Sequence, residues 1–147
     1  SSQVTCRDID DDGYIEIPED TSSKKQSSEI TSQNWVNYGN TVLSHKCYSF
    51  SCKRDGYILV IDDDDFSKIK ANYDSELRKL TIINKKNKSN VFEIVTLINS
   101  NYSVNDPKYK DYTMIMKNSG FVYLAKVNKS SDIDINIQTL KDMIKVY

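Results

Sequence analysis

Short strand-like segments separated by turn signals fill residues 41–127, and they limit the possible folds more than any other feature of the sequence. Their apolar residues alternate with polar ones or form short runs, as in half-buried and buried strands. Turn signals such as RDG and KNSG lie between them. The segments are TVLSHKCYSFSC (41–52), YILVI (57–61), SKIKANY (67–73), LRKLTII (77–83), VFEIVTLI (91–98), YTMIM (112–116) and FVYLAKV (121–127). They predict about seven antiparallel strands.

The spacing of apolar residues changes to a helical period in residues 130–147. Steps of four and three place five of them on one helical face: Ile133, Ile137, Leu140, Ile144 and Tyr147. Ser131 is placed to cap this helix, because a serine hydroxyl accepts hydrogen bonds from the free N–H groups of a first turn. The sequence therefore predicts a mainly β fold, in which a curved antiparallel sheet or barrel is capped by one C-terminal α-helix.

This order of elements resembles the pleckstrin-homology (PH) superfamily over residues 35–147. PH domains usually carry a tryptophan in the last helix, whereas the only tryptophan here is Trp35 and the helix has Ile, Leu and Met instead. The resemblance implies a non-catalytic membrane-targeting module that binds phosphoinositide headgroups. The alternative is a PH-like domain that binds a protein, or another part of its own chain, without lipid affinity.

Basic residues in two predicted turns supply the cations that a phosphate group needs. The resemblance places lipid contacts in the hairpin from Lys46 to Tyr57, and a second basic turn follows in NKKNKSN. The candidate lipid-binding residues are Lys46, Lys53, Arg54, Lys85, Lys86 and Lys88. Each basic residue near an anionic membrane contributes about 1 kcal/mol. Asp55 and the run Asp62–Asp65 would oppose binding if they share that rim, and the lysines are otherwise ordinary solvated turn residues.

The acidic stretch DIDDDGYIEIPE (8–19) has the spacing of a calcium-binding EF-hand loop, with Gly13 at the sharp turn and Ile15 at the apolar position. The pattern predicts side-chain oxygens from five residues, with Glu16 binding either directly or through a water, and one backbone carbonyl, that of Tyr14. These ligands are Asp8, Asp10, Asp12, Tyr14, Glu16 and Glu19. Only seven residues precede the loop, and a helix leaving it would start near Pro18. We therefore expect a partial EF-hand with calcium as its cofactor. A second interpretation is that YIEIPED (14–20) adds as a strand to a partner sheet.

A partial EF-hand followed by a PH-like domain resembles the regulatory segment of apicomplexan calcium-dependent protein kinases that carry EF-hands and a PH domain. The resemblance implies a larger signalling protein, whose partners are an anionic phospholipid membrane and an intramolecular kinase domain. The sequence has no glycine-rich kinase loop, no HRD and no DFG motif, and no nucleophile–base arrangement stands out. These residues are therefore expected to be non-catalytic.

Charge and composition divide the chain into an acidic start and a mildly basic body. Residues 1–32 hold three basic and eight acidic side chains, and residues 33–147 hold seventeen and thirteen. We expect residues 1–34 to be the partial EF-hand loop and a flexible polar linker, and residues 35–147 to be the PH-like domain. The basic excess suits an anionic membrane surface and is too small for nucleic-acid binding.

Three cysteines are an odd number, which argues for a reducing compartment. One histidine and two cysteines, His45, Cys47 and Cys52, are too few for a complete metal site, and strand alternation places Cys52 on the opposite face from the other two. No apolar run reaches the length of a membrane span. The expected location is therefore cytoplasmic and peripheral to a membrane. The missing initiator methionine suggests a piece of a longer protein.

Overall fold

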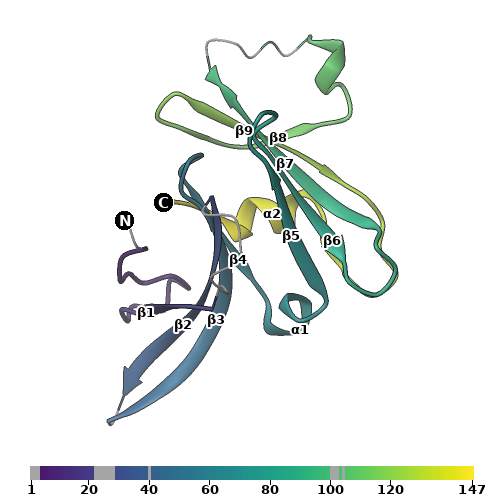
Figure 1. The fold of residues 1–147 in the computed structure, drawn as a ribbon. Helices are drawn as coiled ribbons and strands as arrows, with labels where there is room; N and C mark the ends of the chain where they lie inside the picture. The colour runs from purple at the N-terminus through teal and green to yellow at the C-terminus, as the bar shows by residue number, and fades with distance from the viewer. Residues whose placement is uncertain (1–3, 22–28, 40, 100–102, 104) are drawn as a thin grey trace. The chain divides into compact units, whose positions relative to one another are not determined.

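The computed structural model describes residues 4–21, 29–39, 41–99, 103 and 105–147 (Figure 1). The chain forms two compact units, residues 1–67 with 145–147 (unit 1) and residues 68–144 (unit 2). Each unit has one five-stranded antiparallel sheet, so the fold is mainly β with one C-terminal helix, as the sequence predicts. The described strands number ten instead of about seven, and the sheets are not closed into a barrel.

Unit 1 contains the order β1-β2-β3-β4-β10. The strands are β1 (Ile17–Asp20), β2 (Ile30–Gly39), β3 (Val42–Cys52), β4 (Tyr57–Ile61) and β10 (Ile144–Val146). The predicted strands at 41–52 and 57–61 are confirmed, and a short helix, α1 (Asp63–Phe66), lies in the acidic run. β2 begins at Ile30, before the expected domain start at residue 35. Of the expected linker, residues 22–28 lie outside the described residues.

Unit 2 contains the order β5-β6-β7-β9-β8, and its five strands confirm the five that the sequence predicts there. The strands are β5 (Ile69–Asp74), β6 (Lys79–Asn84), β7 (Asn90–Ile98), β8 (Thr113–Asn118) and β9 (Phe121–Val127). A short 3-10 helix, η2 (Pro107–Tyr109), lies between β7 and β8 in the sequence. β7 is central in the sheet and is buried from Val91 to Thr96, because it has neighbouring strands on both sides.

The C-terminal helix, α2 (Ile137–Met143), is shorter than the apolar spacing predicts. Asn136 caps it instead of Ser131: its Oδ1 accepts the Thr139 N–H at 2.9 Å, and its own N–H donates to the Thr139 hydroxyl at 3.4 Å. The helix ends at Met143 because Ile144–Val146 forms β10, where alternate β-branched residues suit a strand. No helix in the described part of the chain has the length and hydropathy needed to cross a membrane.

The core of unit 1 is built around Trp35 in β2, which is fully buried. Its indole N–H donates to the Ser49 hydroxyl at 2.8 Å, and Ser49 donates to Gln33 at 2.7 Å, so these buried polar groups are satisfied. The Trp35 ring belongs to a buried apolar cluster with Ile58 and Ile9. Since Ile9 comes from the acidic stretch, that stretch is attached directly to the core of the sheet.

Candidate functional site

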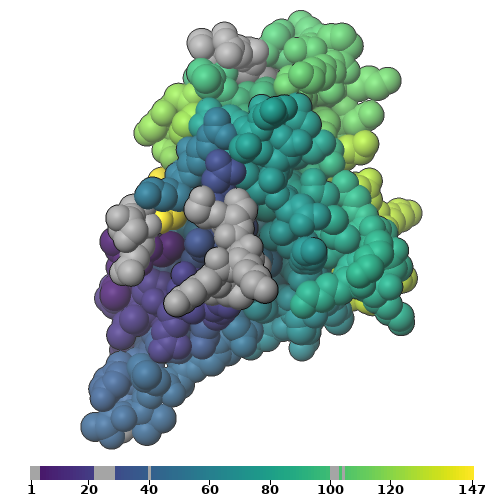
Figure 2. Space-filling model, viewed as in Figure 1, coloured from purple at the N-terminus to yellow at the C-terminus, as the bar shows by residue number. Residues whose placement is uncertain are grey.

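The acidic stretch forms a hairpin loop, which we call the acidic loop (residues 8–16). Arg7 and Glu16 close it as a β-bridge, with hydrogen bonds of 3.1 Å from Arg7 N to Glu16 O and 2.9 Å from Glu16 N to Arg7 O. β1 follows at Ile17 and pairs with β2. A strand, and not the helix expected near Pro18, therefore leaves the loop. The loop lies at the surface of unit 1 beside residues of β2 and β3 (Figure 2).

Hydrogen bonds from the backbone to its own carboxylates shape the acidic loop. The Asp8 carboxylate accepts the N–H groups of Asp12 at 3.0 Å and Gly13 at 2.8 Å, and Asp12 accepts the N–H of Tyr14 at 2.9 Å. Gly13 has a φ of 91°, in the left-handed region where a Cβ is disfavoured. These contacts curl the backbone so that side chains at alternate positions turn inward.

Four carboxylates converge inside this curl. Ligand oxygens of Asp8, Asp10, Asp12 and Glu16 all lie within 4.8 Å of one another. Glu16 is fully buried, and its two oxygens accept the Ile9 N–H at 3.0 Å and the Asn37 side-chain amide at 3.4 Å. Several carboxylate oxygens in one small space form the donor set that hard cations such as Ca²⁺ prefer. The residues present therefore fit a calcium ion.

One of the five predicted carboxylate ligands, Glu19, does not belong to this group, since it lies in β1 opposite Asn34. The sixth predicted ligand, the backbone carbonyl of Tyr14, stays a prediction. The acid at the ninth position of the loop pattern thus completes the cluster, in place of the acid at the twelfth. The reason is local: the chain returns to the sheet at Glu16, and the strand that follows carries Glu19 away from the loop.

Two lysines from other strands face the acidic loop. The Lys46 Nζ lies 3.2 Å from Asp12 Oδ2, and the Lys145 Nζ lies 3.2 Å from Asp11 Oδ2. The Tyr14 N–H and Lys46 lower the pKa of Asp12, whereas burial and the charge of Asp12 raise the pKa of Asp10. Sequence reasoning missed Asn37 and Lys145 at this site, because β2 and β10 bring them there from distant parts of the chain.

Lys46→Gln should increase the calcium affinity of the acidic loop by roughly tenfold, because it removes a positive charge that repels the ion and competes for Asp12. Isothermal titration calorimetry at low ionic strength measures this change. Lys145→Gln is the matched control, since Lys145 contacts Asp11, which is outside the four-carboxylate group, and its effect should be smaller. An unchanged or weaker affinity in the Lys46 variant would contradict this electrostatic role.

The basic residues predicted for lipid binding are divided between the two units. Lys46 lies within β3, facing the acidic loop, while Lys53 and Arg54 form the turn between β3 and β4. Arg54 Nη1 lies 3.9 Å from Glu29. Asp55, in the same turn, is fully buried, and its carboxylate accepts the Cys52 thiol at 3.5 Å. The earlier hairpin of unit 1, β2–β3, has no basic residue in its turn.

Lys85, Lys86 and Lys88 are exposed on the turn between β6 and β7 in unit 2. Hydrogen bonds from backbone N–H groups hold the turn in place. The Lys86 N–H donates to the Asn84 side chain at 2.9 Å, and the Lys85 N–H donates to the Lys68 carbonyl at 2.8 Å. This turn therefore presents three cationic side chains at one end of its own sheet.

No family model, no curated protein and no solved structure matches this chain. The acidic loop and the basic turns are therefore the features of the molecule from which a function can be proposed.

Proposed function

We propose that the acidic loop binds Ca²⁺ and that the chain is a non-catalytic regulatory module of a larger calcium-linked signalling protein. The observation that carries this proposal is the convergence of four carboxylates, one of them fully buried, inside a closed hairpin loop. Asp8, Asp10, Asp12 and Glu16 would hold the ion. A bound cation would offset the mutual repulsion that four close carboxylates otherwise exert.

Ile9 links the proposed ion site to the hydrophobic core of unit 1. It stands between two of the carboxylate residues, Asp8 and Asp10, and its side chain is buried against Trp35 and Ile58. An ion that fixes both neighbouring carboxylates also restricts the position of Ile9. Calcium binding would then alter how firmly the acidic loop is held against β2 and β4. A local change of charge would in this way have a structural consequence.

Calcium titration followed by tryptophan fluorescence tests this proposal, because Trp35 is the only tryptophan and contacts Ile9. Starting in chelator, we expect a saturable change with a Kd of about 10⁻⁵–10⁻³ M, the range of weaker calcium loops. Asp10→Asn is the control, and it should weaken binding strongly. The absence of saturable binding below about 1 mM, confirmed by calorimetry, would overturn the proposal.

A second proposal is that the turn between β6 and β7 binds phosphoinositide-containing membranes. Its support is the exposure of three lysines on one turn, none of which forms an ion pair within the described ranges. Three cations near an anionic lipid surface contribute about 3 kcal/mol together. Under this proposal, unit 2 would contact the predicted membrane partner. The alternative is a protein-binding domain without lipid affinity.

The triple variant Lys85→Gln/Lys86→Gln/Lys88→Gln should lose about 100-fold in affinity for vesicles that contain phosphoinositide. Liposome co-sedimentation at several salt concentrations measures it, since binding by exposed charges weakens as salt rises. Lys53→Gln/Arg54→Gln is the comparison, because it removes cations from the other predicted turn. Loss in this double variant alone would move the lipid site to the turn between β3 and β4. The absence of binding to any vesicle, even at low salt, would favour the protein-binding alternative.

A further inference from the structure

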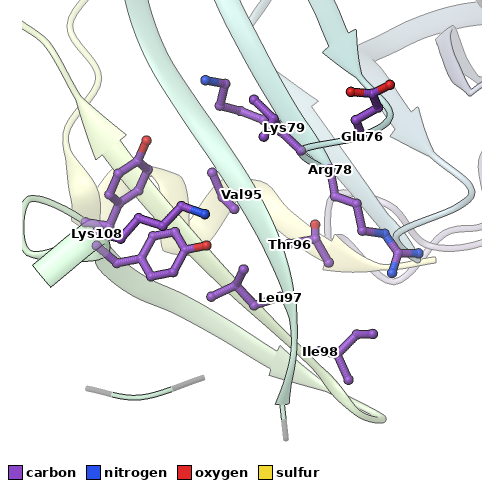
Figure 3. A pocket seen from close by; sticks show the side chains of 11 residues that line it. Glu76, Arg78, Lys79, Val95, Thr96, Leu97, Ile98 and Lys108 are labelled. Carbon is purple, nitrogen blue, oxygen red and sulfur yellow. The ribbon is translucent and has the colours of Figure 1, made fainter. Parts of the chain in front are cut away.

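A cavity of about 400 Å³ opens on unit 2, along the end of β7 (Figure 3). We call it the β7 groove; it is lined by residues 76–79, by residues 95–98 of β7 and by residues 108, 109 and 112. All of these residues belong to unit 2. The volume of the groove lies in the range of ligand-binding clefts. Neither the acidic loop nor the turn between β6 and β7 contributes residues to its lining.

β7 extends beyond its neighbour β6 at this groove. The described ladder between the two strands ends with Lys79 opposite Val95, followed by a 2.9 Å bond from Thr96 N to Arg78 O. Backbone N–H and C=O groups alternate in direction along a strand, so Ile98, two residues after Thr96, also directs its groups away from β9. Among the described residues, the N–H and C=O groups of Ile98 therefore form a short strand edge along the groove that β6 does not cover.

Apolar and aromatic side chains form the walls of the β7 groove. Leu77 and Ile98 are 52% and 46% exposed at its rim, and Val95 is buried at its base. Tyr109 and Tyr112 contact each other edge to face, with ring centroids 5.9 Å apart. The Tyr112 hydroxyl donates to Glu93, which holds this wall in place. An exposed apolar rim of this kind suits an apolar side chain of a ligand.

The polar groups of the groove favour an anionic ligand. It holds three cations, Arg78, Lys79 and Lys108, against one carboxylate, that of Glu76. Figure 3 shows Lys108 on the side of β7 to which Val95 and Leu97 point, and Arg78 on the side of Thr96 and Ile98. The cations thus border the strand edge on both faces. The Thr96 hydroxyl is buried and has no hydrogen-bond partner among the described residues.

We propose that the β7 groove binds an extended acidic peptide that contains apolar residues. The peptide backbone would pair with the end of β7, as in recognition by strand addition, and its side chains would alternate between the two faces of the sheet. Carboxylates on either face would meet cations, and apolar residues would cover Leu77, Leu97 and Ile98. An open groove beside a strand edge suits such a chain better than it suits a lipid tail, which needs an enclosed cavity. This inference concerns unit 2 and does not depend on calcium.

Selection of a phage-displayed random heptapeptide library against the full chain tests the proposal, with chelator present throughout. We expect enrichment of peptides that alternate Asp or Glu with apolar residues. Their affinity, measured by fluorescence anisotropy, should fall by about tenfold or more in Lys79→Gln/Lys108→Gln. Analogues with methylated backbone nitrogens, which keep every side chain but lose N–H donors, should bind at least about tenfold more weakly.

Lys85→Gln/Lys86→Gln is the matched control, because it removes the same charge from another turn of the same unit, and it should leave peptide affinity unchanged. Amide NMR shifts should map to residues 95–98. A library that yields no enriched peptide overturns the proposal, and so do peptides that bind the Lys79/Lys108 variant as tightly as the natural chain. Binding of dodecanoate at residues 95–98 without any peptide binding would also overturn it, in favour of a site for single-chain amphiphiles.

Discussion

Glu16→Ala should weaken calcium binding by about 100-fold or more, whereas Glu19→Ala should leave it unchanged. Glu16 brings a buried carboxylate into the four-carboxylate group, and Glu19 lies outside it in β1. The spacing of the acidic stretch gives the opposite expectation, because the EF-hand pattern assigns two carboxylate oxygens to the twelfth position. Calorimetric titration of both variants separates these two arrangements.

Glu16→Gln is the necessary control for this pair. The Glu16 carboxylate also accepts the Ile9 N–H and the Asn37 amide, so its removal affects the loop itself. Glutamine keeps the size of the side chain and an acceptor oxygen but lacks the charge, and it should still lose most of the calcium affinity. Loss of binding in Glu19→Ala with retention in Glu16→Ala would show that the loop binds calcium as a twelve-residue hand.

Ile9→Ala should lower the unfolding free energy of unit 1 by about 2–4 kcal/mol. Ile9 is fully buried in the cluster with Trp35 and Ile58, and truncating it leaves a cavity beside the indole ring. Urea denaturation followed by fluorescence measures this loss, since the single tryptophan lies in unit 1. Circular dichroism of the same samples reports both sheets, so a shift in fluorescence alone would locate the damage in unit 1.

Ile15→Ala is the matched control in the same loop. Ile15 is 61% exposed, so its truncation should change stability by no more than about 0.5 kcal/mol. The EF-hand pattern marks Ile15 as the important apolar position, while the structure buries Ile9 instead. Equal costs for the two variants would contradict the packing of the acidic loop against Trp35.

Seven of the ten described strands were predicted from the sequence, because alternation and turn residues are local signals, whereas β1, β2 and β10 were not. The segment FVYLAKV and the run YILVI each became a strand at the predicted residues. The end of the helix was harder to predict, because Ile144 fits a helical face and a strand equally well. Its pairing in β10, next to β4, depends on contacts with residues far away in the sequence. A capping pair three residues apart, Asn136 and Thr139, was the local signal for the true start of the helix.

The candidate sites show the same division between local and distant information. The first three acids of the loop are fixed by spacing, but the choice between Glu16 and Glu19 depends on whether a strand or a helix follows. Lys46 reads as a lipid contact in the sequence and meets Asp12 only because β3 passes beside the loop. The β7 groove exists because β6 ends before β7 does, and no local pattern records the relative ends of two paired strands.

Unit 1 is interrupted in the sequence by the whole of unit 2. Its last strand, β10, and the Tyr147 N–H that donates to the Gly56 carbonyl at 2.9 Å are supplied by residues 144–147. During synthesis at about 5–20 residues per second, residues 68–144 take on the order of 4–15 s to be made. For that time β4 has no β10 beside it, and Asp11 lacks Lys145. The surroundings of the acidic loop are therefore completed only after the whole of unit 2 has been synthesised.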